Sequence, residues 1–463
     1  MFSSADSTIT PLGSQSLYNK LRIYRDDSAE LHSDYAVYHS LRRDTRIREQ
    51  LQLILWSLRS DSNAHICDSL FGEVPSAPRW ARLVWCMSLV SVCVLLATIV
   101  NPTLWWLLGI AVLCNLIVVA LLHRGIHETF LATGRIGRMV SIAVRLARVN
   151  APTPVSQPAE LRAILNESED LRRSFRWLLV DRSNDLVASV FLWLNLLLLA
   201  DHVASLFAAR NLRRHRDTLA RVYLQIGSLD ADIAIASWLQ RIPSHCRPQF
   251  TSQNCVDIHD GFHPLLSAPV ANSIILRGQS ALVVGTNMAG KTTFIKMVGT
   301  NIILSRTVGV CFASAALIPR SRVLASIRAE HSIESGKSRF FAELERILDF
   351  VRTAEGHEQT VFLIDEPFSG TNTPERVASA KAVLEYLGST AQVLATTHDI
   401  ELQDLLERSF RAFHFVENPE LTEVFDYRLR PGISTSKNAI ALLERLGFPS
   451  GIIREARRIA GRF

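Results

Sequence analysis

Cysteine is scarce in this chain and follows no pattern. The 463 residues include seven cysteines, with no Cys-x-x-Cys pair and no spacing typical of a metal site. A secreted protein held by disulfides needs paired cysteines, so that class is excluded, and buried thiols in a reducing compartment are expected. The amino terminus lacks a basic segment followed by an apolar one, so no cleaved signal peptide is predicted.

Charged residues are also few. They make up 20% of the chain against 48% hydrophobic residues, which is the balance of a folded protein and excludes a disordered one. The net charge of +6 is compatible with nucleic acid, with anionic lipid or with solubility alone, so composition leaves the partner open. The length is enough for roughly two to four domains.

Charge is missing altogether from two long apolar runs in the first third of the chain. They cover residues 83–100 and 103–122, and only Asn101 and Pro102 separate them. Each run is about long enough to cross a hydrocarbon core of about 30 Å as a helix. The sequence therefore predicts a transmembrane helical hairpin over residues 81–124, in preference to a hairpin buried in a soluble core.

Basic residues flank both runs. Arg79 and Arg82 precede the first run, and Arg124, Arg135 and Arg138 follow the second. Basic flanks stay on the cytoplasmic side of a membrane, so both ends of the hairpin are expected there. We therefore predict a multi-pass protein of the inner (cytoplasmic) membrane whose later residues lie in the cytoplasm.

A third apolar run, residues 186–200, is shorter and is bordered by Asp185 and Asp201. As a membrane span it would place everything after it outside the cell, so we predict a helix buried in protein. The basic segment 210–221 that follows predicts one further helix. Its arginines form either a solvated face or a contact for nucleic acid or lipid headgroups; the candidate contacts are Arg210, Arg213, Arg214 and Arg216.

The rest of the chain divides into helical and mixed regions. Residues 1–80 and 125–255 are expected to be helical. From about residue 256 onward, strand-like runs alternate with helical ones, which predicts an α/β domain with a largely parallel sheet. The strand-like runs cover residues 273–285, 360–367, 391–398 and 422–429. The expected fold is thus an α/β domain that follows an all-α region carrying the hairpin.

The stretch "GTNMAGKTT", residues 285–293, has the spacing of a phosphate-binding loop. Gly285 and Gly290 let the backbone fold around an anion, and the helix that starts near Lys291 adds its positive dipole end. Lys291 is expected to reach the β- and γ-phosphates of a nucleotide, and Thr292 to offer its hydroxyl to Mg²⁺. An apolar strand before the loop and a helix after it are predicted.

Two carboxylates complete the expected chemistry. The apolar run "TVFLIDEP" ends in Asp365, which can hold Mg²⁺ through water, and Glu366, which can orient or deprotonate the attacking water. His398 ends the next apolar strand in "ATTHD", where a histidine can contact the γ-phosphate. These residues together predict an ATPase in which Glu366, Lys291 and His398 are catalytic.

The ordered set "GTNMAGKTT", "FLIDEPFSGTNTPER" and "ATTHDIEL" resembles the ATPase domain of the MutS mismatch-repair family, as do "GFHPLL", "ANSIIL" and the tail from Phe425. The resemblance covers residues 256–463. It implies a P-loop, ABC-like ATPase that uses ATP and Mg²⁺. It also implies a homodimer in which each subunit completes the other's site, with a dimerising helix-turn-helix over about residues 432–463 built from helix 437–446, a turn at 447–450 and a second helix.

The resemblance also assigns residues. His263 and Pro264 match the position beside the adenine, and Ser338 and Glu343 match a nucleotide-sensing segment. Asn372 stands where members usually have serine. The residues implied to bind nucleotide in the loop are Gly285, Thr286, Asn287, Met288, Ala289, Gly290, Lys291, Thr292 and Thr293; those implied to reach the other subunit's γ-phosphate are Thr371, Asn372 and Thr373.

Several parts of the family pattern are missing from the sequence. No mismatch-reading domain with its Phe-x-Glu wedge is expected, and no nuclease module is expected after the ATPase domain. Residues 10–22 resemble the start of the family's helical core, which the hairpin then interrupts. Three functions therefore compete: a membrane-tethered ATPase that binds double-stranded DNA, a membrane ATPase that moves a protein or lipid partner, and an ABC transporter subunit. The last is the weakest, because its LSGGQ-type signature is absent.

Overall fold

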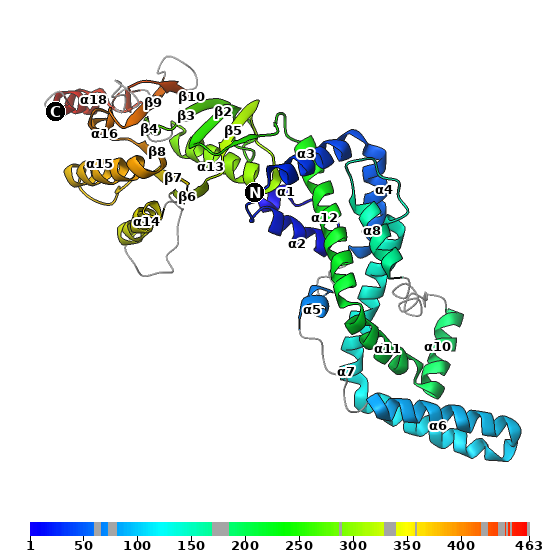
Figure 1. Ribbon diagram of the computed structural model, residues 1–463. Helices are drawn as coiled ribbons and strands as arrows, with labels where there is room; N and C mark the ends of the chain where they lie inside the picture. The colour runs from blue at the N-terminus through cyan, green and yellow to red at the C-terminus, as the bar shows by residue number, and fades with distance from the viewer. Residues whose placement is uncertain are drawn as a thin grey trace. The chain divides into compact units, whose positions relative to one another are not determined.

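The computed structural model describes residues 1–59, 66–72, 81–168, 185–286, 289–327, 339–356, 359–417, 425–433, 440, 443–444 and 447–460 (Figure 1). The chain forms two compact units. The first contains Met1–Lys20 and Ala36–Gln240, and the second contains Leu21–Tyr35 and Arg241–Phe463. The second unit thus begins before residue 256 and also takes up a short segment from near the amino terminus.

Every element described in the first unit is a helix. The expectation of an all-helical amino-terminal region is therefore confirmed for the described residues. The elements are α1 (Phe2–Ala5), α2 (Pro11–Lys20), the second half of α3 (Ser28–Arg43), α4 (Thr45–Leu55), η1 (Trp56–Leu58), α5 (Ile66–Phe71), α6 (Ala81–Val100), η3 (Pro102–Leu104), α7 (Trp105–Leu146), α8 (Gln157–Glu167), α10 (Asp185–Leu198), α11 (Ala200–Arg214) and α12 (Arg216–Gln240).

Helices α2 and α12 pack closely although they are about two hundred residues apart in the chain (Figure 1). The carboxylate of Asp230, on α12, accepts hydrogen bonds from the backbone N–H groups of Ile9 and Thr10 and from the Thr10 hydroxyl. These donors precede α2, so Asp230 supports the amino end of that helix. Burial raises the pKa of Asp230 to about 6, so at neutral pH it is a buried carboxylate whose charge these donors stabilise.

Helices α6 and α7 form a helical hairpin whose turn is η3 (Figure 1). The segments Leu83–Val100 and Pro102–Ala120 are long and apolar enough to cross a membrane, and only 17% of each segment is buried within the protein. A hairpin inside a soluble core would bury most of this surface. Helix α7 continues to Leu146, so the helix predicted to end with the apolar run at residue 122 is much longer than the run itself.

The third apolar run is helical, as predicted, but it is not a fully buried helix. Helix α10 ends at Leu198, Leu199 adopts a left-handed conformation with φ of 52°, and α11 begins at Ala200. Trp193 on α10 is 61% exposed. The expected burial is therefore wrong for this side chain.

The basic segment predicted as one helix is divided between two. Helix α11 ends at Arg214, His215 is its C-cap, and α12 begins at Arg216. The break allows Leu212 and Leu219, on either side of it, to be buried at once. The arginines of residues 210–221 therefore do not line a single helix.

The second unit contains two sheets. The six-stranded sheet has the order β10-β9-β4-β8-β7-β6 and is parallel except for β10, which pairs antiparallel with β9. Its strands are β4 (Ser280–Val284), β6 (Arg322–Ser326), β7 (Thr360–Asp365), β8 (Gln392–Thr397), β9 (Phe410–Glu417) and β10 (Phe425–Pro431). The largely parallel sheet predicted from the sequence is thus confirmed.

A smaller four-stranded sheet has the order β1-β5-β2-β3. The run 273–285, expected as one strand, is split at Gly278 (φ of 72°) between β3 of this sheet and β4 of the larger one. The strands of the four-stranded sheet are β1 (Gln249–Thr251), β2 (Cys255–Gly261), β3 (Asn272–Arg277) and β5 (Ala315–Pro319). The helices of the second unit include α13 (Lys291–Val308), α14 (Arg339–Ala354), α15 (Thr373–Thr390), α16 (Glu401–Leu406) and α18 (Ser450–Ala460).

Both faces of the parallel sheet are buried. Along β4, Ala281 and Val283 belong to the core that contains Phe294 of α13, whereas Leu282 and Val284 belong to the core that contains Leu384 of α15. Strands buried on both faces read as continuous apolar runs, which explains why they stand out in the sequence. Because β4, β7 and β8 are parallel, their carboxyl ends lie along one edge of the sheet.

Candidate nucleotide-binding site

The glycine-rich loop connects the end of β4 to the start of α13. Gly290 has φ of 101°, a conformation that favours glycine, and lets the helix begin at Lys291. The ammonium group of Lys291 donates hydrogen bonds to the carbonyls of Gly285 (2.7 Å) and Thr286 (2.9 Å). Its side chain is only 4% exposed. The cation is therefore held inside the loop, while Asn287 and Met288 lie outside the described residues.

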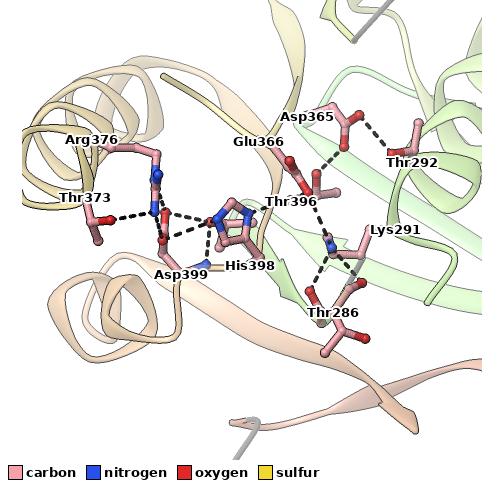
Figure 2. A network of polar contacts seen from close by, with 12 residues as sticks. Thr286, Lys291, Thr292, Asp365, Glu366, Thr373, Arg376, Thr396, His398 and Asp399 are labelled. Carbon is pink, nitrogen blue, oxygen red and sulfur yellow. Dashed lines mark hydrogen bonds and ion pairs between the residues drawn. The ribbon is translucent and has the colours of Figure 1, made fainter. Parts of the chain in front are cut away.

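The end of β7 meets the start of α13 through Asp365. The hydroxyl of Thr292 donates to Asp365 Oδ2 at 2.9 Å, and the hydroxyl of Thr396 donates to Asp365 Oδ1 (Figure 2). A hydroxyl and a carboxylate at this spacing are the hard oxygen donors that Mg²⁺ prefers, so the residues present fit that ion. Sequence reasoning missed Thr396, which is opposite Asp365 in the parallel register of β8 and β7.

Glu366 follows Asp365 in the chain, and its side chain lies beside Lys291. Its carboxylate is 3.5 Å from the ammonium of Lys291 and 3.7 Å from His398 Nδ1. Glu366 is 7% exposed and has φ of 50°, an uncommon conformation for a residue other than glycine, and such backbone strain is often found at functional sites. The three residues predicted as catalytic are therefore brought together at the carboxyl edge of the sheet (Figure 2).

An ion pair beside His398 was not predicted. Arg376 on α15 donates from Nε and Nη2 to the two oxygens of Asp399, at 2.8 and 2.6 Å (Figure 2). The hydrogen bond to Asp399 raises the pKa of the Arg376 guanidinium. Asp399 Oδ1 also lies 3.7 Å from His398 Nε2. The bidentate ion pair between Arg376 and Asp399 therefore fixes the segment that carries His398. Both residues lie within the quoted motifs, but their pairing depends on the fold.

The segment predicted to reach the other subunit lies at the amino end of α15. Asn372 is the N-cap of the helix, because its side-chain oxygen accepts from the backbone N–H of Glu375 at 3.1 Å. The hydroxyl of Thr371 donates to the Glu375 carboxylate, and that of Thr373 accepts from Arg376. Asn372 and Thr373 are exposed. Their contact with a second subunit remains a prediction.

A cavity of about 380 Å³ opens beside the loop. His263 lines it, whereas the neighbouring Pro264 is not one of its described lining residues. Burial, with a smaller contribution from the charge of Lys296, lowers the pKa of His263, so the imidazole is neutral at physiological pH. The cavity is also lined by Gly261, Leu266, Ala268, Val270, Asn272, Gly290, Lys291, Thr292, Thr293, Phe294, Met297, Glu366, Phe415 and Tyr427.

Several of these lining residues were not singled out from the sequence, and two of them, Asn272 and Tyr427, are linked by a hydrogen bond. The Asn272 side chain donates to the carbonyl of Tyr427 at 3.0 Å and accepts from the backbone N–H of Leu429 at 2.7 Å. Tyr427 has φ of 53°. Asn272 therefore fixes β10 so that an aromatic ring faces the cavity. The signal was present in the quoted segments "ANSIIL" and "FDYRL", but only the fold brings them together.

The segment matched to nucleotide sensing also contacts the site. Glu343 on α14 accepts a hydrogen bond from the backbone N–H of Phe368 at 2.6 Å. Phe368 is two residues after Glu366 and also has positive φ. Helix α14 is thus linked to the loop that carries Glu366, while Ser338 lies outside the described residues.

Comparison with known proteins identifies this domain. Residues 281–463 match the family model for MutS domain V. Residues 281–463 therefore form a domain of the MutS family. The DNA mismatch repair protein MutS of Lactobacillus delbrueckii subsp. bulgaricus is 26% identical over 260 residues, which are 53% of this chain and 30% of that protein.

Two further relatives show the same coverage. The endonuclease MutS2 of Pelotomaculum thermopropionicum is 32% identical over 50% of this chain and 30% of its own length. MutS protein homolog 4 of Mus musculus is 31% identical over 47% of this chain and 24% of its own length. The chain therefore spans less than a third of the length of these curated relatives, and each match is confined to about half of this chain.

The arginines predicted to contact nucleic acid or lipid lie in the first unit. Arg210, Arg213 and Arg214 are exposed on α11. Arg216 instead donates from Nε to the carbonyl of Leu70 and from Nη2 to that of Gly72, both at 2.6 Å. Arg216 is therefore engaged within the protein, which removes it from the candidate contacts.

Proposed function

We propose that this MutS-family chain is a membrane-anchored ATPase that binds ATP with Mg²⁺ and hydrolyses it. The observation that carries the proposal is the convergence of Lys291, Thr292, Asp365 and Glu366 at one edge of the parallel sheet. A cation, two oxygen ligands for a metal and a further carboxylate are the groups that phosphoryl transfer to water requires. Their match to MutS domain V supports the same conclusion.

Each side chain has a distinct role in the proposed reaction. Lys291 would exchange its hydrogen bonds to the loop carbonyls for the β- and γ-phosphates. Thr292 and Asp365 would hold Mg²⁺, which would neutralise phosphate charge when bound. Glu366 would orient and deprotonate the attacking water, and His398 would contact the γ-phosphate. The cavity lined by His263 and Tyr427 would take the adenine.

The test of this assignment is Lys291→Ala. Removal of the cation should weaken ATP binding and reduce turnover by at least tenfold, because a charge-assisted contact in a buried site is lost. Fluorescent nucleotide binding and phosphate release measure the two effects. The control is Lys381→Ala, which removes an exposed cation on α15 and should change neither. Wild-type affinity and turnover in Lys291→Ala would show that the loop does not bind phosphate.

We further propose a homodimer. In such a dimer, Thr371, Asn372 and Thr373 would reach the γ-phosphate bound by the other subunit. The described part of the carboxyl-terminal region supports a dimerising role, because α18 leaves Ile452 and Ile459 exposed at 51% and 45%. Phe448 in the preceding turn is also exposed. ATP binding would close the dimer and hydrolysis would reopen it.

The hairpin of α6 and α7 is proposed to anchor the protein in the inner membrane, with both termini in the cytoplasm. Its exposed apolar surface supports this, because water would surround it otherwise. We propose double-stranded DNA as the partner, bound without reading of mismatches. The alternative is a protein or lipid partner moved by the same ATPase.

A further inference from the structure

Helices α10 and α11 pack against the hairpin of α6 and α7, and α11 also contacts α12. Their contacts with α6 begin at Val84, which packs with Leu199, and at Trp85, whose ring centroid is 5.2 Å from that of Phe207. On α7, Val118 belongs to the same apolar cluster. Figure 1 shows α10 and α11 near the start of α6 and far from the hairpin turn.

Polar side chains of the hairpin hold the carboxyl end of α10. The Ser88 hydroxyl donates to the carbonyl of Leu198 at 2.8 Å. The fully buried amide of Asn115 donates to the carbonyls of Leu196 (3.1 Å) and Leu197 (3.0 Å). The last carbonyls of a helix lack partners within that helix, and in apolar surroundings they must find donors elsewhere. These two caps therefore fix α10 against the hairpin at one level.

Measured from the start of the apolar run, that level lies in the first half of the hydrocarbon core. Asn115 also donates to Ser91, the deepest α6 residue in these contacts. At 1.5 Å per residue, Ser91 lies about 12 Å along the helix from Leu83, where the apolar run begins. A hydrocarbon core is about 30 Å thick. Beyond this level many hairpin side chains are exposed, including Leu96 at 58%, Ile99 at 71% and Trp105 at 64%.

Helix α10 is not built to cross the membrane. Its 14 residues span about 21 Å, less than a hydrocarbon core. Leu199 then turns the chain, and α11 packs back on α6 and α7. Yet Trp193 and Phe207 remain 61% and 51% exposed. This combination of an apolar exposed surface and a shallow level excludes both a span and an ordinary soluble core.

We propose that α10 and α11 form an in-plane membrane element. In this arrangement α10 lies in the interfacial layer at the cytoplasmic base of the hairpin, with Trp193, Phe207 and Trp85 at the level that aromatic side chains prefer. The last turns of α11 carry Arg210, Arg213 and Arg214 to the headgroups of anionic lipids. The proposal rests on the membrane anchoring proposed above, and it assigns these arginines to lipid.

Depth measurements test the element in the full chain. The seven cysteines are replaced, single cysteines are introduced at Leu113, Trp193, Phe207, Arg210 and Tyr386, and each is spin-labelled in lipid nanodiscs of phosphatidylethanolamine and phosphatidylglycerol. Collision with oxygen reports the hydrocarbon and collision with a water-soluble nickel chelate reports water. Leu113, 59% exposed in the hairpin, should be deep, and Tyr386, 43% exposed in the ATPase domain, should be in water.

The proposed element predicts intermediate depth at positions 193 and 207 and headgroup level at 210. A label at 193 in water, with 113 deep, would overturn the in-plane element and leave the anchor intact. A label at 193 as deep as 113 would make α10 a span. Exclusion of both reagents at 193 would indicate that a protein partner covers it, which also overturns the proposal. A label at 113 in water would instead remove the membrane anchor itself.

A pair of hairpin variants tests the caps. Asn115→Leu keeps the branched shape of the side chain but removes the donor for the α10 carbonyls, so the label at 193 should become more mobile and change depth. Thr98→Val is the matched control. Thr98 is also buried in the hairpin, but its hydroxyl donates only to Leu95 within the same helix. An unchanged spectrum in Asn115→Leu would show that the caps do not position α10.

Discussion

At the scale of single residues, the proposed site would separate groups that bind ATP from a group that acts on water. Lys291 and Asp365 hold charges where phosphates and metal would lie, whereas the Glu366 carboxylate lies 3.5 Å from the Lys291 ammonium and 3.7 Å from His398 Nδ1. A carboxylate poised beside a cation and an imidazole is suited to accept a proton from water. Binding and hydrolysis should therefore respond to different substitutions.

Glu366→Gln should bind ATP and fail to hydrolyse it. The amide keeps the shape of the side chain and leaves Asp365 unchanged, but it cannot accept the proton. Loss of a general base costs about a hundredfold or more in rate. Single-turnover hydrolysis and nucleotide retention measure this, and Glu401→Gln, in the exposed first turn of α16, is the control. Hydrolysis at an undiminished rate would mean that another residue activates the water.

Local spacing explains which residues could be found from the sequence. Lys291 and Thr292 follow from a loop pattern within nine residues, and Asp365 from the end of an apolar strand. Thr396 and Arg376 contribute as much to the geometry, but their partners are 31 and 23 residues away. Those contacts exist only because β7 and β8 are neighbours and α15 packs beside them, which spacing alone does not specify.

At the scale of elements, the first unit depends on the close approach of helices α2 and α12. A side chain at Gly227, on α12, would place its Cβ 2.3 Å from the Ser16 hydroxyl and 2.9 Å from the backbone carbonyl of Leu12. The side chain of Ser16 can move, but the backbone of α2 cannot do so without shifting the helix. Only glycine allows this separation.

Gly227→Ala should therefore lower stability by about 1–3 kcal/mol, the usual result of overpacking a buried contact. The measurement is thermal unfolding of the detergent-solubilised chain, followed by circular dichroism. Gly134→Ala is the matched control, because Gly134 is also helical but has nothing within 4 Å of the added carbon. There alanine should be neutral or stabilising, since it favours the helix. Equal midpoints for the two variants would rule out the close contact.

The same scale shows where sequence reasoning about elements fails. The run 273–285 reads as one strand, yet Gly278 divides it between two sheets. The segment 210–221 reads as one helix, yet His215 ends it. In both cases apolar periodicity continues across the break, and only long-range packing reveals that the chain changes direction. Helix α13 and the apolar first part of α7 were predicted, whereas the continuation of α7 as one helix to Leu146 was not.

At the scale of the whole molecule, the proposed topology places the ATPase domain and both termini on one side of the membrane. Asn101, at the hairpin turn, is exposed and would be near the far face. In a chain without its native cysteines, Asn101→Cys should react with an impermeant maleimide added to intact cells. Arg210→Cys and Glu375→Cys should react only after lysis. Labelling at 210 in intact cells would place α10 across the membrane and the ATPase domain outside.

Binding of DNA is the remaining question at this scale. Mismatch discrimination needs a side chain that wedges beside a mispaired base, and none is predicted here. Arg213 and Arg214 are exposed, but a positive charge contacts phosphates and reads no sequence.

The affinity for duplex DNA should therefore be weak and fall steeply between about 50 and 200 mM salt. The logarithm of the association constant should fall by about 0.9 per log unit of salt concentration for each phosphate contacted. Titration of matched and mismatched duplexes with ATP should give equal affinities. A mismatch preference above about tenfold, or ~1.4 kcal/mol, would require a reading element. No binding at low salt would favour the protein or lipid partner.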